Sequence, residues 1–292
     1  MDAGPDSGDV PDSELSWPGA TAGSRSKSLR APNPEGIVRP PCWHVTMLLA
    51  RVLHAVGGGS RVKVADPMVL VATTEEVFAS PDFSEEMLTL EERRRVAAFR
   101  RDEDRAGFVA AHALVRICAM RLLGLPAASL RLVQRCDTCG GAHGRPVLAD
   151  HGGMYLSMAH TRGVVTAAAG WGPVGVDVER VPRRRAEADM NAHALSEAEL
   201  AVVRQARDPH AAFLRQWVRK EALIKIGSAT LAGLREVDLA HLPLDDGVET
   251  AQRLSPLGGR WPHLHLLDWW DLTRRVIGAA IGDRPPRLSA LG

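Results

Sequence analysis

The chain has 292 residues, 45% of them hydrophobic, which is enough for one large domain or two modest ones with a buried core. Its 36 basic and 35 acidic side chains leave a net charge of +1, so the composition gives no strong attraction to nucleic acid or to a membrane surface. Four cysteines do not make a disulfide framework in a chain this long, and the longest uncharged stretch, 163–176, is too short to cross a bilayer. We find no convincing targeting segment and expect a cytoplasmic protein.

Residues 1–60 are rich in Pro, Gly, Ser and Asp and show little apolar periodicity, so we expect a disordered leader and linker there. Beyond them, hydrophobic patterning predicts strands at 68–72, 146–148, 155–158, 164–168 and 174–178, with a last one within 269–281. It predicts helices at 88–123, 196–205 and 210–226. Ser196 and Glu199 form a capping-box pattern at the second of these helices. This order of elements predicts an α+β fold with two similar halves that meet near 170–175.

The segment Val174–Glu179 (VGVDVE) carries the first group of residues suited to chemistry. Side chains two apart in a strand point the same way, so we expect Asp177 and Glu179 to project together while Val176 and Val178 face the core. Two carboxylates 4 Å apart repel by roughly 4 kcal/mol at an effective dielectric near 20, and a bound Mg²⁺ removes that repulsion. Taken alone, this acidic pattern is more typical of an edge strand whose polar face lies in water.

The segment Trp217–Lys225 (WVRKEALIK) carries the second group. On a helix, Trp217, Glu221 and Lys225 lie four apart along one face, and Lys220 lies next to it. Taken alone, Glu221 and Lys225 indicate only a stabilising pair worth roughly a few tenths of a kcal/mol. However, only four of the 36 basic residues are lysine, and two of the four fall in this segment. Lysine kept in an arginine-rich sequence indicates a site that needs a compact ammonium group.

The strand VGVDVER, followed about forty residues later by WVRKEALIK, resembles the signature pair of the 4′-phosphopantetheinyl transferases. Within that family, the chain most resembles the monomeric, two-lobed type that serves polyketide and non-ribosomal peptide synthetases. Weaker features follow in the family order, and the resemblance covers roughly residues 65–282. These weaker features are the stretch Leu90–Arg116, the GRP segment Gly144–Pro146 and the SMAHT segment Ser157–Thr161.

The resemblance implies two similar α+β lobes, at 61–172 and 173–292, related by pseudo-two-fold symmetry with the active site between them. It also implies an enzyme, a holo-[acyl-carrier-protein] synthase. Such an enzyme transfers the 4′-phosphopantetheine moiety of coenzyme A to a serine of an acyl or peptidyl carrier protein and releases adenosine 3′,5′-bisphosphate. The expected partners are coenzyme A and carrier protein domains, without nucleic acid or membrane, and the expected state is a monomer.

The resemblance assigns catalytic and metal-binding roles to the two signature segments. Asp177, Glu179 and Glu221 would hold Mg²⁺ together with the coenzyme A pyrophosphate. Glu221 would also be the base for the carrier-protein serine, directly or through water. Lys225, with Lys220 nearby, would neutralise charge on the transferring phosphoryl group and the leaving phosphate, as phosphoryl transfer requires.

The resemblance assigns coenzyme A contacts to the weaker segments. His160 would contact a phosphate, and Arg145 and Arg95 would serve the nucleotide end. Three places differ from the family pattern. Ala159 replaces its serine, Gly107 stands where it commonly has arginine, and Gly227–Ala229 lacks the second glycine usual after the lysine segment. We expect these differences to weaken the contacts to the nucleotide, while the metal site is unaffected.

Two other functions stay open at this point. A metal-dependent pyrophosphate hydrolase acting on coenzyme A would also use the acidic cluster, although no segment resembles the Nudix box. A non-catalytic, carrier-binding relative would account for Ala159 and Gly107. Separately, Cys136 and Cys139 could bind zinc with His143, but two cysteines alone favour a plain loop.

Overall fold

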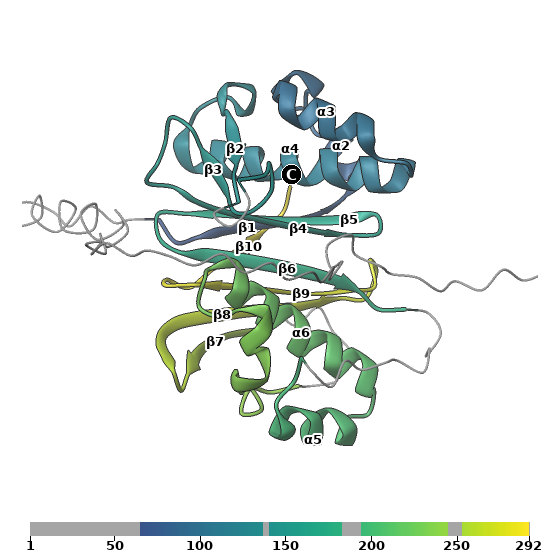
Figure 1. Ribbon diagram of the computed structural model, residues 1–292, viewed down its shortest axis with the longest axis vertical. Coiled ribbons are helices and arrows are strands. Elements are labelled where there is room, and N and C mark those ends of the chain that lie inside the picture. Colours follow the sequence, from purple (N-terminus) through teal and green to yellow (C-terminus); the bar gives the residue numbers. More distant parts are fainter. Residues whose placement is uncertain (1–64, 137–139, 183–193, 245–252, 292) are drawn as a thin grey trace, which may run out of the picture. The chain divides into compact units, whose positions relative to one another are not determined.

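We describe the protein from a computed structural model in which the described residues are 65–136, 140–182, 194–244 and 253–291 (Figure 1). The leader and linker predicted at 1–60 lie outside them. Two four-stranded sheets and a two-stranded hairpin organise the described chain, with helices between the strands. This mixed content agrees with the predicted α+β class.

The first sheet combines strands from the beginning, the middle and the very end of the described chain. In spatial order they are β10 (Arg287–Ser289), β1 (Met68–Thr73), β5 (Val164–Gly170) and β4 (Tyr155–Thr161). β1 pairs antiparallel with β5 and parallel with β10, so the last strand of the chain returns to the first. β5 is buried along its whole length, as expected for a strand covered on both faces.

Helices cover the outer face of this sheet (Figure 1). They are α2 (Thr74–Ala79), α3 (Leu90–Ala98) and α4 (Asp102–Leu123), beside a hairpin of β2 (Leu132–Gln134) and β3 (Pro146–Leu148). In the described part of the chain, α4 alone is long and apolar enough to span a membrane, but 67% of its apolar window is buried inside the protein. It serves as the central helix of the first core.

The single helix predicted at 88–123 is two helices in the structure. Thr89 begins α3 with a capping box to Glu92, and α3 ends at Phe99, where the backbone is extended. α4 then starts with three acidic residues in its first turn, which favour a new helix because they lie at its positive dipole end. The prediction was wrong because apolar periodicity alone does not show such a break.

The second sheet is antiparallel throughout. In spatial order its strands are β6 (Val174–Arg180), β9 (Val276–Gly282), β8 (Trp261–Asp271) and β7 (Arg253–Gly258). Its helical elements are α5 (Glu197–Gln205), α6 (Pro209–Lys225) and the 3₁₀ turn η3 (Leu231–Glu236). The capping box of Ser196 and Glu199 is confirmed at the start of α5. The strand predicted within 269–281 is confirmed as β9, although the same region also holds the end of β8 and a further strand, β10, follows it.

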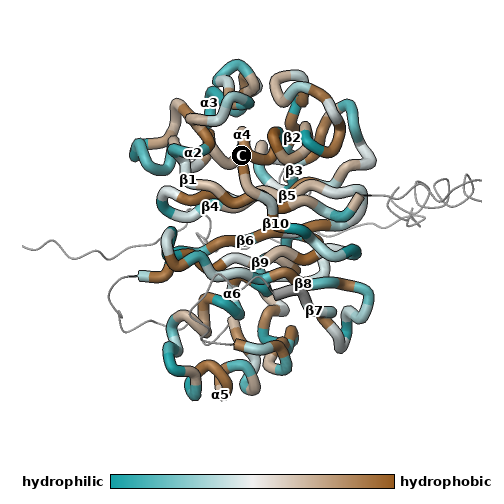
Figure 2. Tube along the Cα trace, turned by 180° about the vertical axis from the view of Figure 1, so that it is seen from behind, coloured by the Kyte–Doolittle hydropathy of each residue, from teal (hydrophilic) through white to brown (hydrophobic). Residues whose placement is uncertain are grey.

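The two sheets pack through a shared apolar layer. Val69 and Ala168 of the first sheet lie in one cluster with Val176 and Trp269 of the second, and Figure 2 shows hydrophobic residues along β6 in the middle of the molecule. A side-chain bond joins the sheets as well, since the backbone N–H of Val176 donates to Ser157 Oγ at 3.0 Å. β6 is therefore held between the first sheet and α6.

Candidate functional site

β6 presents a polar face to α6. Val176 points the other way, into the layer between the sheets, as strand alternation predicts. Gly175 shares the polar face with Asp177 and Glu179, and a Cβ added to it would come within 2.3 Å of the Ala222 carbonyl oxygen on α6. Glycine therefore lets the two main chains touch, and this contact places both carboxylates directly beside the helix.

α6 presents a matching stripe of Trp217, Glu221 and Lys225. Lys225 Nζ donates to Asp177 Oδ1 at 2.7 Å and to a β6 backbone carbonyl oxygen at 2.8 Å. Burial raises the pKa of Glu179, and the Trp217 side chain opposes that shift. Glu221 interacts electrostatically with both β6 carboxylates. The structure thus brings the predicted residues of the two signature segments, Lys220 excepted, to one strand–helix interface.

The three carboxyl groups at this interface all have raised pKa values. Burial raises the pKa of Asp177, and the charge of Lys225 opposes that shift. Burial also raises the pKa of Glu179 to about 7, with a further contribution from Asp177. The pKa of Glu221 is raised by burial first and by Asp177 second. Grouped carboxyls with raised pKa values are typical of functional sites, because such crowding costs stability and needs a reason.

The chemistry of these carboxylates fits a divalent cation. Asp177 Oδ2 is buried and accepts no hydrogen bond from the described residues, whereas buried polar atoms normally have a partner. Three carboxylates offer the oxygen ligands that Mg²⁺ prefers. As they stand, however, no three His, Cys, Asp or Glu side chains in the described ranges are grouped closely enough to hold a metal ion. Carboxylates repel one another, so Asp177, Glu179 and Glu221 share an interface without the spacing of a coordination shell.

His160 on β4 reaches the same site from the first sheet. Its exposed ring interacts electrostatically with Lys225 and Asp177. Desolvation by the surrounding protein lowers its pKa, and Lys225 adds to that shift, so the imidazole is neutral at pH 7. Gly107 of α4 leaves space for the ring, since a Cβ there would lie 3.1 Å from His160 Nδ1. Ala159 is buried in an apolar cluster on the opposite face of β4, so a hydroxyl there would not lie beside His160.

Arg145 reaches the turn that follows α6. A Cβ added to Gly227 would lie 3.2 Å from the Arg145 guanidinium, and Gly227 adopts a left-handed φ of 78° just after Lys225. The Arg145 side chain is exposed. An exposed guanidinium beside the Lys225 end of α6 suits a phosphate-bearing ligand, so the position is compatible with the predicted role of Arg145.

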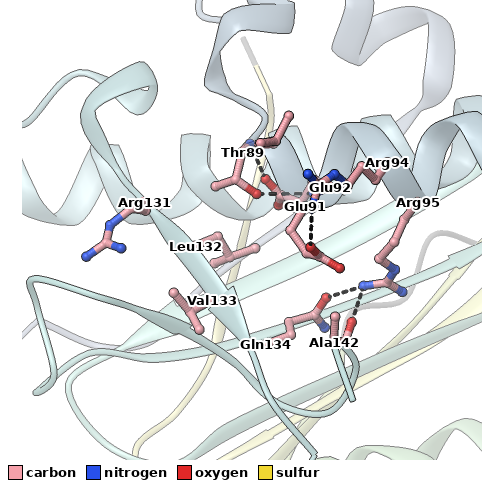
Figure 3. A pocket seen from close by; sticks show the side chains of 11 residues that line it. Thr89, Glu91, Glu92, Arg94, Arg95, Arg131, Leu132, Val133, Gln134 and Ala142 are labelled. Atoms are coloured by element: carbon pink, nitrogen blue, oxygen red, sulfur yellow. Dashed lines mark hydrogen bonds and ion pairs between the residues drawn. The ribbon is translucent and has the colours of Figure 1, made fainter. Parts of the chain in front are cut away.

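Arg95, at the end of α3, is held by the hairpin region. It donates to Gln134 Oε1 at 3.0 Å and to the Ala142 carbonyl oxygen at 2.6 Å, and its guanidinium lies 4.6 Å from the centre of the Phe108 ring. Arg95, Gln134 and Ala142 border a surface cavity of about 360 Å³ beside α3 and β2 (Figure 3). The role of Arg95 at the nucleotide end stays a prediction.

Lys220 does not face the site. It is fully buried, and its Nζ lies 2.6 Å from a Glu199 carboxylate oxygen and donates to the carbonyl oxygens of Ala194 and Leu234. These partners use all three ammonium hydrogens, so none is left for a coenzyme A phosphate. The structure therefore contradicts the predicted role of Lys220. Five residues separate it from Lys225, and this spacing puts the two lysines on different faces of α6.

A second buried charge network joins α3 to α4. His112 Nδ1 and Glu92 Oε1 are 2.5 Å apart, and Arg116 donates to the same carboxylate at 2.7 Å. Burial alone would raise the pKa of Glu92, but the hydrogen bonds from His112 and Arg116 outweigh it and lower that pKa to about 2. The His112 ring also stacks on Phe108 with centroids 4.0 Å apart. These satisfied groups hold the two helices together.

Two features of the site were not predicted. The close approach at Gly175 has a signal in the sequence, because a glycine inside a strand often marks a point where another backbone comes near. The effect of Trp217 on the pKa of Glu179 has no such signal, since it depends on how α6 lies along β6. The zinc hypothesis falls partly outside the described residues, which include Cys136 but not Cys139.

Residues 173–278 match the family model described as the 4′-phosphopantetheinyl transferase superfamily. The match includes β6 and α6 and therefore Asp177, Glu179, Glu221 and Lys225. This part of the chain is accordingly a domain of that superfamily, and the resemblance seen in the sequence is confirmed at this level. No curated protein matches the chain.

Proposed function

We propose that the chain transfers the 4′-phosphopantetheine moiety of coenzyme A to a serine hydroxyl of an apo acyl or peptidyl carrier protein, in a Mg²⁺-dependent reaction. It would be a holo-[acyl-carrier-protein] synthase of the type that serves polyketide and non-ribosomal peptide synthetases. One observation carries the proposal: a buried Asp177 oxygen, which has no hydrogen-bond partner among the described residues, lies beside Glu179, Glu221 and Lys225, inside the segment matched to the superfamily.

The proposal includes an architecture of two similar lobes, 61–172 and 173–292, related by a pseudo-two-fold axis with the active site between them. Two observations support it. The described residues form two four-stranded sheets, and His160 on β4 interacts electrostatically with Asp177 on β6. We further propose a cytoplasmic monomer, because the buried Cys118 is a free thiol, which suits a reducing compartment.

In the proposed reaction, the serine oxygen bonds to the phosphorus that carries the pantetheine. The bond from that phosphorus to the adenosine phosphate breaks, and adenosine 3′,5′-bisphosphate leaves. Glu221 takes the serine proton, and its raised pKa brings it nearer to that of an effective base at neutral pH. Lys225 supplies positive charge for the leaving phosphate.

The remaining groups of the site bind and orient. Asp177, Glu179 and Glu221 would hold Mg²⁺, which neutralises pyrophosphate charge when bound. Arg145 provides an exposed guanidinium beside the C-terminal end of α6. His160, as a neutral imidazole, can donate one hydrogen bond to a phosphate oxygen without adding a full charge.

The direct test incubates the protein with apo-carrier protein, coenzyme A and Mg²⁺ and measures the carrier mass. We expect a gain of one phosphopantetheine unit, lost when EDTA removes the metal. No gain with several acyl and peptidyl carriers would refute the proposal. Release of adenosine 3′,5′-bisphosphate without a carrier would instead indicate a pyrophosphate hydrolase. Carrier binding without coenzyme A binding would indicate a non-catalytic relative.

A further inference from the structure

Gly107 is a buried glycine inside helix α4, and the His160 ring lies where its side chain would be. A Cβ added to Gly107 would lie 3.1 Å from His160 Nδ1, 3.6 Å from Cγ and 3.7 Å from Cε1. These three distances show that the imidazole rests against the backbone of the helix. Inside a helix, glycine is disfavoured relative to alanine, so helix formation gives no reason for a glycine here. The contact with the His160 ring does give one.

The main chain on both sides of His160 is held in place. Ala159, the residue before it on β4, packs with Val178 of β6 in one apolar cluster. The turn after β4 is tied to the same strand, since Arg180 donates from Nε and Nη2 to the Arg162 carbonyl oxygen at 3.0 and 2.6 Å. A methyl group added at Gly107 would therefore move the His160 ring, which can turn about its side-chain bonds, and leave the strand where it is.

The position of the ring matters because it lies close to the acidic strand of the site. Val178, which packs with the neighbour of His160, lies between Asp177 and Glu179 on β6, and Asp177 accepts a hydrogen bond from Lys225 Nζ at 2.7 Å. The His160 ring is exposed, so a ligand can reach it. The place of its nitrogen atoms relative to this strand is set by how closely the ring approaches α4.

We propose that Gly107 is a positioning residue for coenzyme A binding. Its missing side chain sets the place of the His160 ring, and with it the place of the N–H that donates to a phosphate oxygen. The inference rests on the proposed function, because it takes coenzyme A as the ligand and His160 as a contact to its phosphate. Gly107 itself touches no ligand and acts through His160.

The sequence offered a different explanation of Gly107, as the loss of an arginine that contacts the nucleotide. The two explanations predict different results for Gly107→Ala. If the glycine only marks a lost arginine, alanine should bind coenzyme A as glycine does, because neither residue supplies a cation. If the glycine positions His160, alanine should bind coenzyme A more weakly.

The test measures coenzyme A binding to Gly107→Ala by calorimetry in the presence of Mg²⁺. We expect the dissociation constant to rise about 3- to 10-fold, up to the loss of one hydrogen bond to a charged group. The thermal unfolding temperature should stay the same or rise, because alanine favours the helix and the exposed ring can yield. Gly153→Ala is the matched control, because its added methyl group has open space around it. Mn²⁺, used alone in place of Mg²⁺, should bind both variants as it binds the wild type.

Two further measurements show whether the effect passes through His160. In NMR spectra of protein with isotopically labelled histidine, the ring signal that disappears in His160→Ala should shift in Gly107→Ala and stay in place in Gly153→Ala. Once His160→Ala is present, Gly107→Ala should change coenzyme A affinity little, because the effects of interacting residues are not additive. Wild-type affinity in Gly107→Ala, or an equal loss with and without the His160 ring, would overturn the proposal.

The outcomes also separate this inference from the proposed function. Wild-type protein that binds coenzyme A but modifies no carrier would refute the transferase assignment, and weaker binding by Gly107→Ala would still support the role of Gly107. Normal transfer by the wild type with unchanged coenzyme A affinity in Gly107→Ala would refute the inference alone. Wild-type protein that binds no coenzyme A would refute both.

Discussion

The two faces of α6 carry charged groups with opposite surroundings. On the buried face, Lys220 is satisfied by Glu199 and two carbonyl oxygens. On the face toward β6, Lys225 has a side chain 26% exposed and lies next to Asp177, one oxygen of which accepts no hydrogen bond within the described part of the chain. The comparison teaches that a buried charged group with all its hydrogen bonds satisfied stabilises the position of the helix. A buried carboxylate with an unsatisfied oxygen can instead bind a ligand.

The largest expected effect comes from removing a carboxylate on the β6 face. Glu221→Gln should slow transfer about 100- to 10,000-fold, because a general base is lost. The thermal unfolding temperature of this variant should stay the same or rise. Burial raises the pKa of Glu221, so its ionised carboxylate destabilises the folded state, and a neutral glutamine removes that effect. Carrier mass gain over time and thermal unfolding check this. A rate near that of the wild type would contradict the assigned role.

The buried face should show the reverse pattern. Glu199→Gln leaves the Lys220 ammonium buried without its counter-ion, and we expect a loss of about 3–5 kcal/mol in the free energy of unfolding. Urea unfolding measures this loss. Lys225→Met is the matched variant on the other face, and it should lose transfer activity with a much smaller change in stability. Equal stability losses in the two variants would remove the contrast between the faces.

The contact that holds the β6 face against α6 can be loosened directly. Gly175→Ala brings a methyl group within 2.3 Å of a helix carbonyl oxygen, so strand and helix must separate, at a cost of about 1–3 kcal/mol. We expect weaker Mn²⁺ binding as well, because the two sets of side chains move apart. Gly153→Ala is the control, since an added Cβ there meets nothing within 4 Å. Wild-type stability in Gly175→Ala would contradict the close approach.

The smallest expected effect is a pH dependence of metal binding. The pKa of Glu179 is about 7 in the folded protein, above the ordinary value of 4.5, and a metal ion binds the ionised form. Mn²⁺ affinity should therefore rise as the pH rises through 7, by at most about tenfold per pH unit for one proton released. Measurements at pH 6 and pH 8 check this, and equal affinities would contradict it.

The same raised pKa fixes the sign of its effect on stability. Between pH 4.5 and 7 the folded state keeps a proton on Glu179 that the unfolded state has lost. The contribution of this group to stability is therefore full below pH 4.5 and is lost as the pH rises through 7. Glu179→Gln should remove this component from the pH dependence of urea unfolding when metal is absent.

Much of the site could be predicted because its signals are local. Strand alternation placed Asp177 and Glu179 together, and helical spacing placed Glu221 and Lys225 on one face. The role of Lys220 was misjudged because its partner Glu199 is distant in the sequence. The break between α3 and α4 was missed for a different reason, since it depends on caps and dipoles within an otherwise continuous apolar pattern. The contact at Gly175 and the effect of Trp217 on Glu179 depend on tertiary register, which one sequence does not specify.

The parallel pairing of β10 with β1 has a practical consequence for handling this protein. The Arg287 backbone N–H donates to the Pro67 carbonyl oxygen at 2.8 Å, and Arg121 of α4 donates to the Ala290 carbonyl oxygen at 2.7 Å. The two ends of the described chain therefore lie on neighbouring strands at one edge of the first sheet. A short peptide joining these ends, with new termini opened in an exposed loop, is a sound design for a circularly permuted enzyme.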